Sequence, residues 1–208
     1  MMLDMRTVLF SYLLSSGICV LMMATLWRQN RSQPGVTFWL ADFVLQFVGV
    51  LLVSLRGVIP DFLSMVVSNL SIVGGTLLLL IGLGRFAGRP SRQRINYLIL
   101  AVFTAIHTYF VVVQPNLQVR NINFSLGLAV FCFQGVWLIF RRVDAEMRLG
   151  LRMVGVALAG IGTLSLVRVP IELLLPSSND LFAPELHVSL PILIYQMLYI
   201  LLTFALTL

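Results

Sequence analysis

Seven apolar stretches follow one another along the chain, each about 20 residues long. A helix of about 20 apolar residues crosses the hydrocarbon core of a bilayer, where every backbone group must find a partner within the protein. The pattern therefore predicts an all-α fold: a polytopic membrane protein with seven transmembrane helices and no separate soluble domain. The predicted spans are residues 7–27, 36–55, 62–83, 95–113, 122–140, 151–169 and 186–208.

Arginines are distributed unevenly between the loops that join these spans. The first, third and fifth loops, together with Arg152 at the start of the sixth span, hold ten of the 14 basic residues, all of which are arginine. Basic residues accumulate in the cytoplasmic loops of membrane proteins. This predicts an N-terminus outside and a C-terminus in the cytoplasm. We expect the first span to be retained rather than cleaved, because the segment before it has no net positive charge and arginines follow it.

The composition excludes a free globular enzyme. Of the 208 residues, 59% are hydrophobic and 11% charged, and the mean hydropathy is +0.99. Soluble domains have about 25% charged residues. A formal charge of +6 usually raises nucleic acid as a partner, but here the arginines mark topology, so the predicted partner is the lipid bilayer. Cys19 and Cys132 both lie in apolar stretches and are interpreted as packing residues.

Several polar residues fall toward the outer side of this topology. They are Arg56, His107, Arg168, Glu172 and His187. One interpretation is interfacial ion pairs, such as Arg168 with Glu172 four residues later, and histidines bonded to neighbouring helices. The other is that all five line an outward-facing cavity that binds a small molecule or a lipid. Polar residues inside membrane spans are candidates for function in general.

A second polar group lies deeper in the predicted membrane. Asp42 is near the cytoplasmic side of the second span, with Trp39 and Gln46 at helical spacing and Asn69 in the third span. These residues could form an intramembrane switch or a proton site. Alternatively, the carboxylate of Asp42 is bonded to a neighbouring helix or to an arginine of a cytoplasmic loop.

Missing residues and motifs restrict the cofactors. A retinal Schiff base needs a lysine amine, and the chain has no lysine, so retinal is excluded. His107 and His187 lie at different depths, which argues against haem. We find no GxxxxGK, HExxH or GxSxG motif and no metal-ligand spacing, so the residues present predict neither an enzyme nor a metal site. The cofactor stays unspecified.

Small residues predict which spans pack closely. They let helix backbones approach one another in a membrane. We therefore expect the third and sixth spans in the bundle interior, from Gly74, Gly75, Gly82, Gly155, Gly160 and Gly162.

Three segments carry a resemblance to a known family. They read Phe-Trp-Leu-Ala-Asp-Phe-Val at 38–44, Leu-Arg-Gly-Val-Ile-Pro-Asp-Phe-Leu-Ser at 55–64 and Ile-Gly-Leu-Gly-Arg-Phe-Ala-Gly-Arg-Pro at 81–90. Together they resemble the N-terminal seven-span membrane-associated sensor region of bacterial diguanylate cyclases of the GGDEF class. Asp42, Arg56, Pro60 and Asn69 match family-typical positions without a known role.

The resemblance implies a function. It suggests a sensory input module in the bacterial inner membrane that acts as a homodimer and regulates cyclic di-GMP synthesis by helix rearrangement. The catalytic domain would be cytoplasmic and follow residue 208, because no GGDEF signature is present here and the last span ends without a polar anchor. The alternatives are a small transporter or channel, and a passive anchor that only localises and dimerises its output domain.

Overall fold

The computed structural model describes residues 5–89, 93–175 and 186–207, with only the backbone at residues 146, 186 and 187. This part of the chain is helical throughout, apart from the turns that join the helices. The elements are α1 (Met5–Gln29), α2 (Val36–Ser54), the π-helical segment η1 (Phe62–Val67), α3 (Ser68–Phe86), α4 (Arg94–Val112), α5 (Leu117–Trp137), the π-helical segment η2 (Leu138–Arg142), α6 (Ala145–Leu174) and α7 (Leu186–Thr207).

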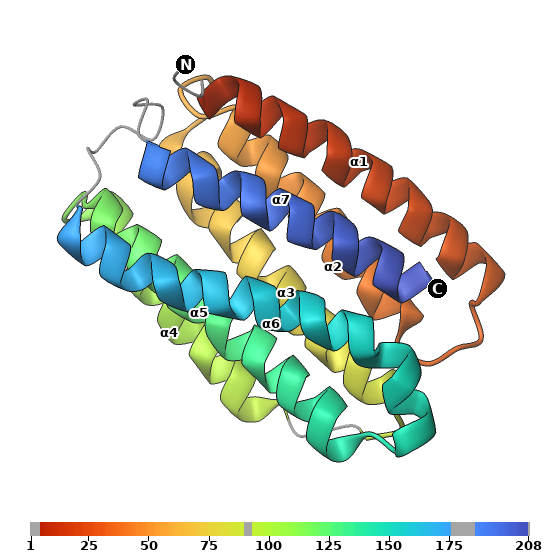
Figure 1. Ribbon diagram of the computed structural model, residues 1–208. Helices are drawn as coiled ribbons and strands as arrows, with labels where there is room; N and C mark the ends of the chain where they lie inside the picture. The colour runs from red at the N-terminus through yellow and green to blue at the C-terminus, as the bar shows by residue number, and fades with distance from the viewer. Residues whose placement is uncertain (1–4, 90–92, 176–185, 208) are drawn as a thin grey trace.

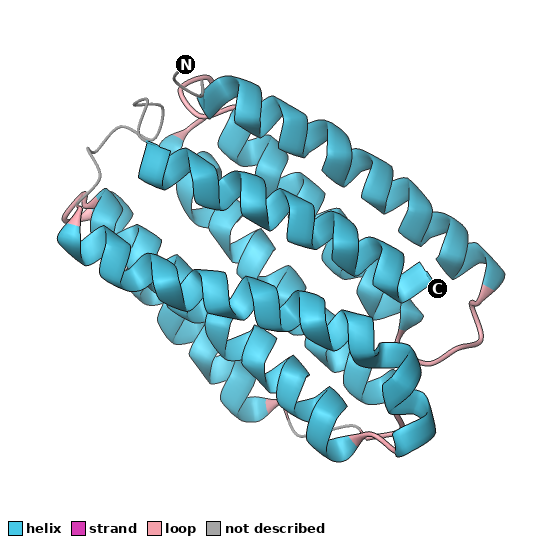
Figure 2. Ribbon diagram, viewed as in Figure 1, coloured by secondary structure: helices cyan, strands magenta, loops and turns pink. Residues whose placement is uncertain are grey.

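All seven predicted spans are found, and each is long and apolar enough to cross a membrane. The helices run nearly side by side along one common direction (Figure 2). The prediction of a seven-helix, multi-pass architecture is therefore confirmed. The apolar pattern was least accurate at the ends of spans five and six, because charged residues continue both helices beyond their apolar stretches.

The fifth and sixth helices are both longer than predicted. The α5 helix begins at Leu117 rather than at residue 122, since the Asn116 side chain caps it by accepting a hydrogen bond of 3.0 Å from the backbone of Val119. The α6 helix extends through Pro170 to Leu174. Pro170 does not end this helix, because proline removes one backbone donor while the next turn still closes, through the 2.8 Å bond from Leu175 N to Ile171 O.

Six helices form a closed ring. Each of the neighbours α1–α2, α2–α3, α3–α5, α5–α6, α6–α7 and α7–α1 is in contact. The α4 helix lies outside this ring and packs against α5, α3 and η1 (Figure 1). The first and last helices of the chain therefore lie side by side and close the ring, which surrounds a central space.

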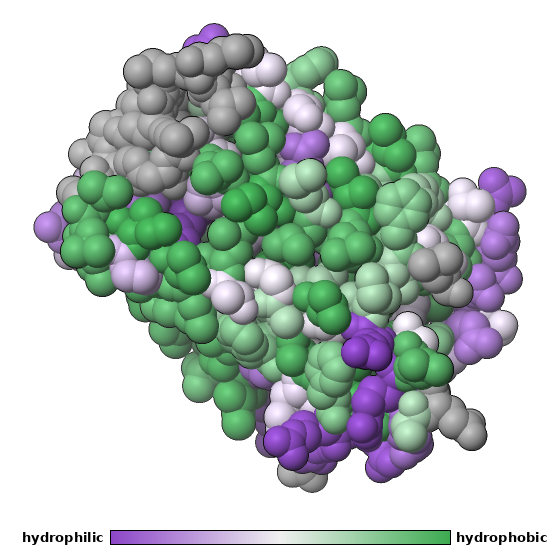
Figure 3. All heavy atoms as spheres, viewed as in Figure 1, coloured by the Kyte–Doolittle hydropathy of each residue, from purple (hydrophilic) through white to green (hydrophobic). Residues whose placement is uncertain are grey.

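One end of the bundle is rich in arginine. At this end α1, α3 and α7 finish and α2, α4 and α6 begin (Figure 1). Hydrophilic residues gather there, while hydrophobic residues cover most of the visible side face (Figure 3). Guanidinium groups lie over aromatic rings, at 4.4 Å for Arg31 on Trp27, 4.3 Å for Arg85 on Phe38 and 4.4 Å for Arg142 on Trp137. Arginines on aromatic rings suit a membrane–water boundary. We call this the arginine-rich end.

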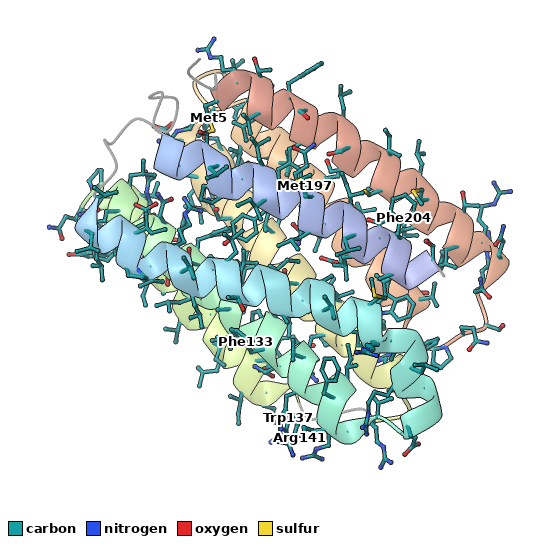
Figure 4. The ribbon with its side chains drawn as sticks, in the orientation of Figure 1. Met5, Phe133, Trp137, Arg141, Met197 and Phe204 are labelled. Carbon is teal, nitrogen blue, oxygen red and sulfur yellow. The ribbon has the colours of Figure 1, made fainter. Side chains whose placement is uncertain are left out.

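The sides of the bundle present large apolar side chains. Phe133 and Trp137 on α5, and Met197 and Phe204 on α7, lie on this outer surface (Figure 4). Met197, for example, is 71% exposed. A surface of apolar side chains along the sides of a helix bundle is suited to contact with the hydrocarbon chains of lipids.

A large apolar core fills the half of the ring nearest the arginine-rich end. It joins α1, α2, α3, α5, α6 and α7, and includes Trp39, Phe43, Cys132 and Leu202. Cys19 also lies in this core, so both cysteines are packing residues as predicted. We call this cluster the closing core, because it fills the ring on that side.

Close contact between α2 and α3 depends on glycine. A Cβ atom at Gly82 would lie 2.6 Å from Cδ1 of Trp39 and 2.9 Å from the Gly35 carbonyl oxygen. Of the seven spans, α3 is the most buried, at 67% of its apolar window, which confirms its predicted interior position. The α6 helix is as buried as α7, at 44% of its apolar window, and its glycines receive side chains such as Phe140 and Leu198 rather than a helix backbone.

We predict opposite effects for two glycine-to-alanine substitutions. Gly82→Ala should lower the free energy of unfolding by about 1–3 kcal/mol, because its methyl group has no room against Trp39. Gly150→Ala, in an open position on α6, should raise it by up to about 1 kcal/mol through helix propensity. Reversible unfolding in detergent micelles, followed by circular dichroism, measures both. Equal effects would show that Gly82 is not a close-packing position.

Candidate functional site

A cavity of about 150 Å³ occupies the centre of the ring. All seven helices contribute side chains to its wall. Arg56, Arg120 and Arg168 line it toward the end away from the arginine-rich end, and Asp42 lines it near the closing core. Fourteen residues separate Asp42 from Arg56, which corresponds to about 20 Å at 1.5 Å per helical residue. The cavity is therefore long and narrow, with charged groups at both ends.

Met65 is the centre of the polar contacts at the Arg120 end. His107 Nε2 donates a hydrogen bond of 3.1 Å to the Met65 carbonyl oxygen. Arg120 Nη1 lies 2.7 Å from the Met65 sulfur, and Asn69 Nδ2 donates to the same carbonyl at 2.6 Å. Residues of α3, α4 and α5 thus meet at one residue of η1.

The π-helical geometry of η1 explains why Met65 can serve this role. The wider turn of a π-helix breaks the regular pattern of backbone pairing and is often found at functional sites. In η1, the Met65 carbonyl accepts from side chains of its own and a neighbouring helix. Through this contact His107 reaches the cavity from α4, which otherwise lies outside the ring.

Arg168 and Glu172 form a buried ion pair. Arg168 Nη2 lies 3.4 Å from Glu172 Oε1, and the two side chains are 5% and 1% exposed. Asn121 Nδ2 donates to the same carboxylate at 2.8 Å, and Gln118 Nε2 donates to the Glu172 backbone carbonyl at 2.7 Å. The predicted pairing of these residues is confirmed, although the pair is buried between α5 and α6 rather than at an exposed interface.

At the other end of the cavity, Asp42 belongs to a network between α2 and α3. Gln46 Nε2 lies 3.2 Å from Asp42 Oδ1, 3.2 Å from the Ile72 carbonyl oxygen and 3.3 Å from Thr76 Oγ1. Gly75 leaves room for the carboxylate, since a Cβ there would lie 2.7 Å from Asp42 Oδ1. Asp42 is thus bonded to its own helix rather than to an arginine of a loop.

The two predicted polar groups share this single cavity. Arg56, His107 and Arg168 of the outer group line it together with Asp42, Gln46 and Asn69 of the deeper group. Glu172 lies behind Arg168. Trp39 does not line the cavity, because its ring packs in the closing core against Phe86, 5.0 Å between ring centroids. The side chain of His187 lies outside the described residues.

Four buried atoms of cavity residues find no hydrogen-bond partner among the described residues. They are His107 Nδ1, Arg120 Nε, Arg168 Nε and Tyr199 Oη. Within the same part of the chain, Arg120 forms no ion pair although it is only 7% exposed. Buried polar groups are normally paired, so the two unpaired guanidinium donors indicate that a ligand can complete them. No three His, Cys, Asp or Glu side chains of the described residues are placed to hold a metal ion.

Sequence reasoning missed Arg120, Asn121 and Met65. The first two were assigned to a loop because the apolar stretch begins at residue 122. The usable signal was Asn116, a residue type that caps helices and that places Arg120 one turn inside α5. Met65 gave no signal, because its role depends on the π-helical geometry of η1.

We predict a strong energetic coupling between Arg168 and Glu172. Glu172→Leu should lower the free energy of unfolding by about 3–5 kcal/mol, because it leaves a buried guanidinium without its partner. Adding Arg168→Met should recover part of that loss, since both charges are then gone. Unfolding of the single and double variants in micelles gives the coupling energy.

The exposed pair of Arg89 and Asp144 is the control. Its atoms are 3.6 Å apart, with side chains 56% and 86% exposed. Asp144→Asn should change the free energy of unfolding by less than about 1 kcal/mol. A Glu172→Leu effect as small as this control would contradict the buried pair.

The chain matches no protein-family model, no curated protein and no solved structure. Inferences about its function therefore depend on the cavity and on the residues that line it.

Proposed function

We propose that this chain is the sensory input module of a bacterial inner-membrane signalling protein, and that it detects a ligand in its central cavity. One observation carries the proposal: a ring of helices surrounds a cavity whose buried arginine and histidine atoms have no partner among the described residues. The closing core fills the ring between this cavity and the arginine-rich end. A ligand bound in the cavity could therefore act on the helices without passing through the closing core to the arginine-rich end.

The last helix is suited to transmit such a signal. Ile192, Tyr195, Tyr199 and Leu202 of α7 all line the cavity. The polar contacts of this helix with its neighbours include Tyr195 with Ser165 at 2.9 Å and Gln196 with Ser11 at 3.0 Å. A ligand that favours one packing of α7 against α1 and α6 shifts the population toward that packing. The shift reaches the arginine-rich end, where α7 finishes.

For the output we propose regulation of a diguanylate cyclase, and hence of cyclic di-GMP synthesis, in a homodimer. The support is the resemblance of residues 38–90 to the sensor region of GGDEF-class enzymes. The excess of arginine at the end where α7 finishes supports an N-out, C-in orientation. In that orientation α7 delivers its movement to the cytoplasm, where nucleotides are available.

A transporter or channel is the second candidate, favoured by polar groups at two depths of one cavity. A conduction path would have to open through the closing core, which is apolar. A passive membrane anchor is the third candidate. It makes no use of the cavity, so it predicts that cavity substitutions leave the output unchanged.

Two reporters fused after Leu208 test the predicted N-out, C-in orientation. Green fluorescent protein should fluoresce there, because it folds in the cytoplasm, and alkaline phosphatase should be inactive, because it needs export to fold. Fusions in the turn after Arg56 should give the opposite pattern. Phosphatase activity after Leu208 would contradict the proposed relay.

We predict that the cavity controls output in a fusion of this chain to a cytoplasmic diguanylate cyclase domain. Ile192→Phe places an aromatic ring in the cavity wall of α7 and should change cellular cyclic di-GMP by at least about fivefold. Met197→Phe is the matched control on the same helix, because its side chain lies on the outer surface (Figure 4). Equal output from both variants, at equal amounts in the membrane, would favour a passive anchor.

A further inference from the structure

Arg120 is in an unusual electrostatic position. Its side chain is buried near the beginning of α5 and lines the cavity. Its Nη1 contacts the sulfur of Met65, a weak acceptor, and its Nε has no partner among the described residues. Arginine does not lose its proton in proteins, so this site carries a full positive charge. Asp61 is within electrostatic reach but forms no ion pair with it among the described residues, and Arg56 adds a second positive charge. A buried charge without an ion-pair partner is costly, and a bound anion would offset that cost.

A second arginine at the same end of the cavity points in the same direction. Arg168 uses Nη2 for its bond to Glu172, while its Nε is left unpaired among the described residues. His107 adds no donor for an anion, because its Nε2 proton is used for the bond to Met65 and Nδ1 is then an acceptor. Guanidinium groups recognise carboxylates and phosphates through their planar array of donors.

The shape and charge of the cavity restrict the rest of the ligand. A cavity of about 150 Å³ accepts a molecule about the size of benzene. Between its charged ends the wall includes Val50, Ile72 and Phe124. The far end holds the carboxyl group of Asp42, which is bonded to Gln46 and offers no positive charge to a second anionic group. A slender molecule with one anionic head and an apolar body fits these constraints.

We propose that Arg120 and Arg168 bind the carboxylate or phosphate head of a slender organic anion. Its apolar body extends along the cavity past Ile72 toward Asp42. This ligand class rests on the proposed sensory function, because it names what the same cavity detects. The anion enters from the aqueous phase, as a short-chain acid, because a long-chain fatty acid from the bilayer is too large for a cavity of about 150 Å³.

The first test compares ligands on the whole chain in nanodiscs made of a zwitterionic phospholipid. The probes are hexanoate, hexyl phosphate, hexanol and palmitate, and the measurement is Tm together with calorimetric titration. We expect hexanoate or hexyl phosphate to raise Tm, as a ligand of the folded state does, and hexanol and palmitate to have no effect. An effect of palmitate alone would show that the anion binds outside this cavity and would overturn the proposal. Equal effects of hexanol and hexanoate, or no effect of any anion, would overturn the proposal.

The second test uses Arg120→Met, with Arg141→Met as the control. Arg141 is an exposed arginine at the arginine-rich end (Figure 4). Arg120→Met should raise Tm of the ligand-free protein, because a buried charge is gone, and weaken binding of the anion more than about tenfold. Arg141→Met should change neither. A merely structural Arg120 would instead lower Tm and leave the affinity unchanged.

A further variant covers the case in which Arg120→Met does not fold. Arg120→Lys keeps the charge but loses the planar fork, and it should fold and bind the anion more weakly than the wild type. Undiminished binding by this variant would overturn the proposal.

Failure of the ligand class and failure of the sensory function give different results. If no probe binds but Ile192→Phe changes cyclic di-GMP in the cyclase fusion, the anion site is wrong and the sensory role stands. If an anion binds through Arg120 but Ile192→Phe and the anion both leave cyclic di-GMP unchanged, the site stands and the sensory role falls.

Discussion

The burial of charged groups inside an apolar helix bundle is the constraint on which the rest of this structure depends. Lipid offers no partner for a guanidinium or a carboxylate, so such groups must face inward. Here they face one central space, which a ring of six helices surrounds. Arg168 is neutralised by Glu172, and Asp42 is held by Gln46. Arg120 has no such partner among the described residues, and this imbalance is what gives the cavity its chemical character.

The polar contacts also explain the irregular elements. The π-helical segment η1 presents the Met65 carbonyl to His107, and α4 packs against η1, α3 and α5 at that point. The Asn116 cap extends α5 far enough to bury Arg120, and the continuation of α6 past Pro170 places Glu172 within reach of Asn121. Each of these three local departures from an ordinary apolar span supplies a residue to the cavity or to its supporting contacts.

The number and order of the spans could be predicted from the sequence, because the length of each apolar stretch is counted directly along the chain. It also indicated most of the polar cavity residues, since Asp42, His107 and Arg168 stand out in apolar surroundings. It could not show that the two polar groups meet in one cavity, because spacing along the chain says nothing about which helices are neighbours. Arg120 was assigned to a loop for a related reason. It stands just before an apolar stretch, and the sequence does not distinguish an arginine there that faces water from one that faces a buried cavity.

Ring closure by α1 and α7 has a consequence for biosynthesis. Among the seven spans, α1 leaves the ribosome first and α7 last, and their contact completes the wall around the central space. A nascent chain of the first six spans would leave a lateral opening toward the lipid between α1 and α6. The binding chamber therefore comes into existence only when the final helix is inserted, so incomplete chains lack it altogether.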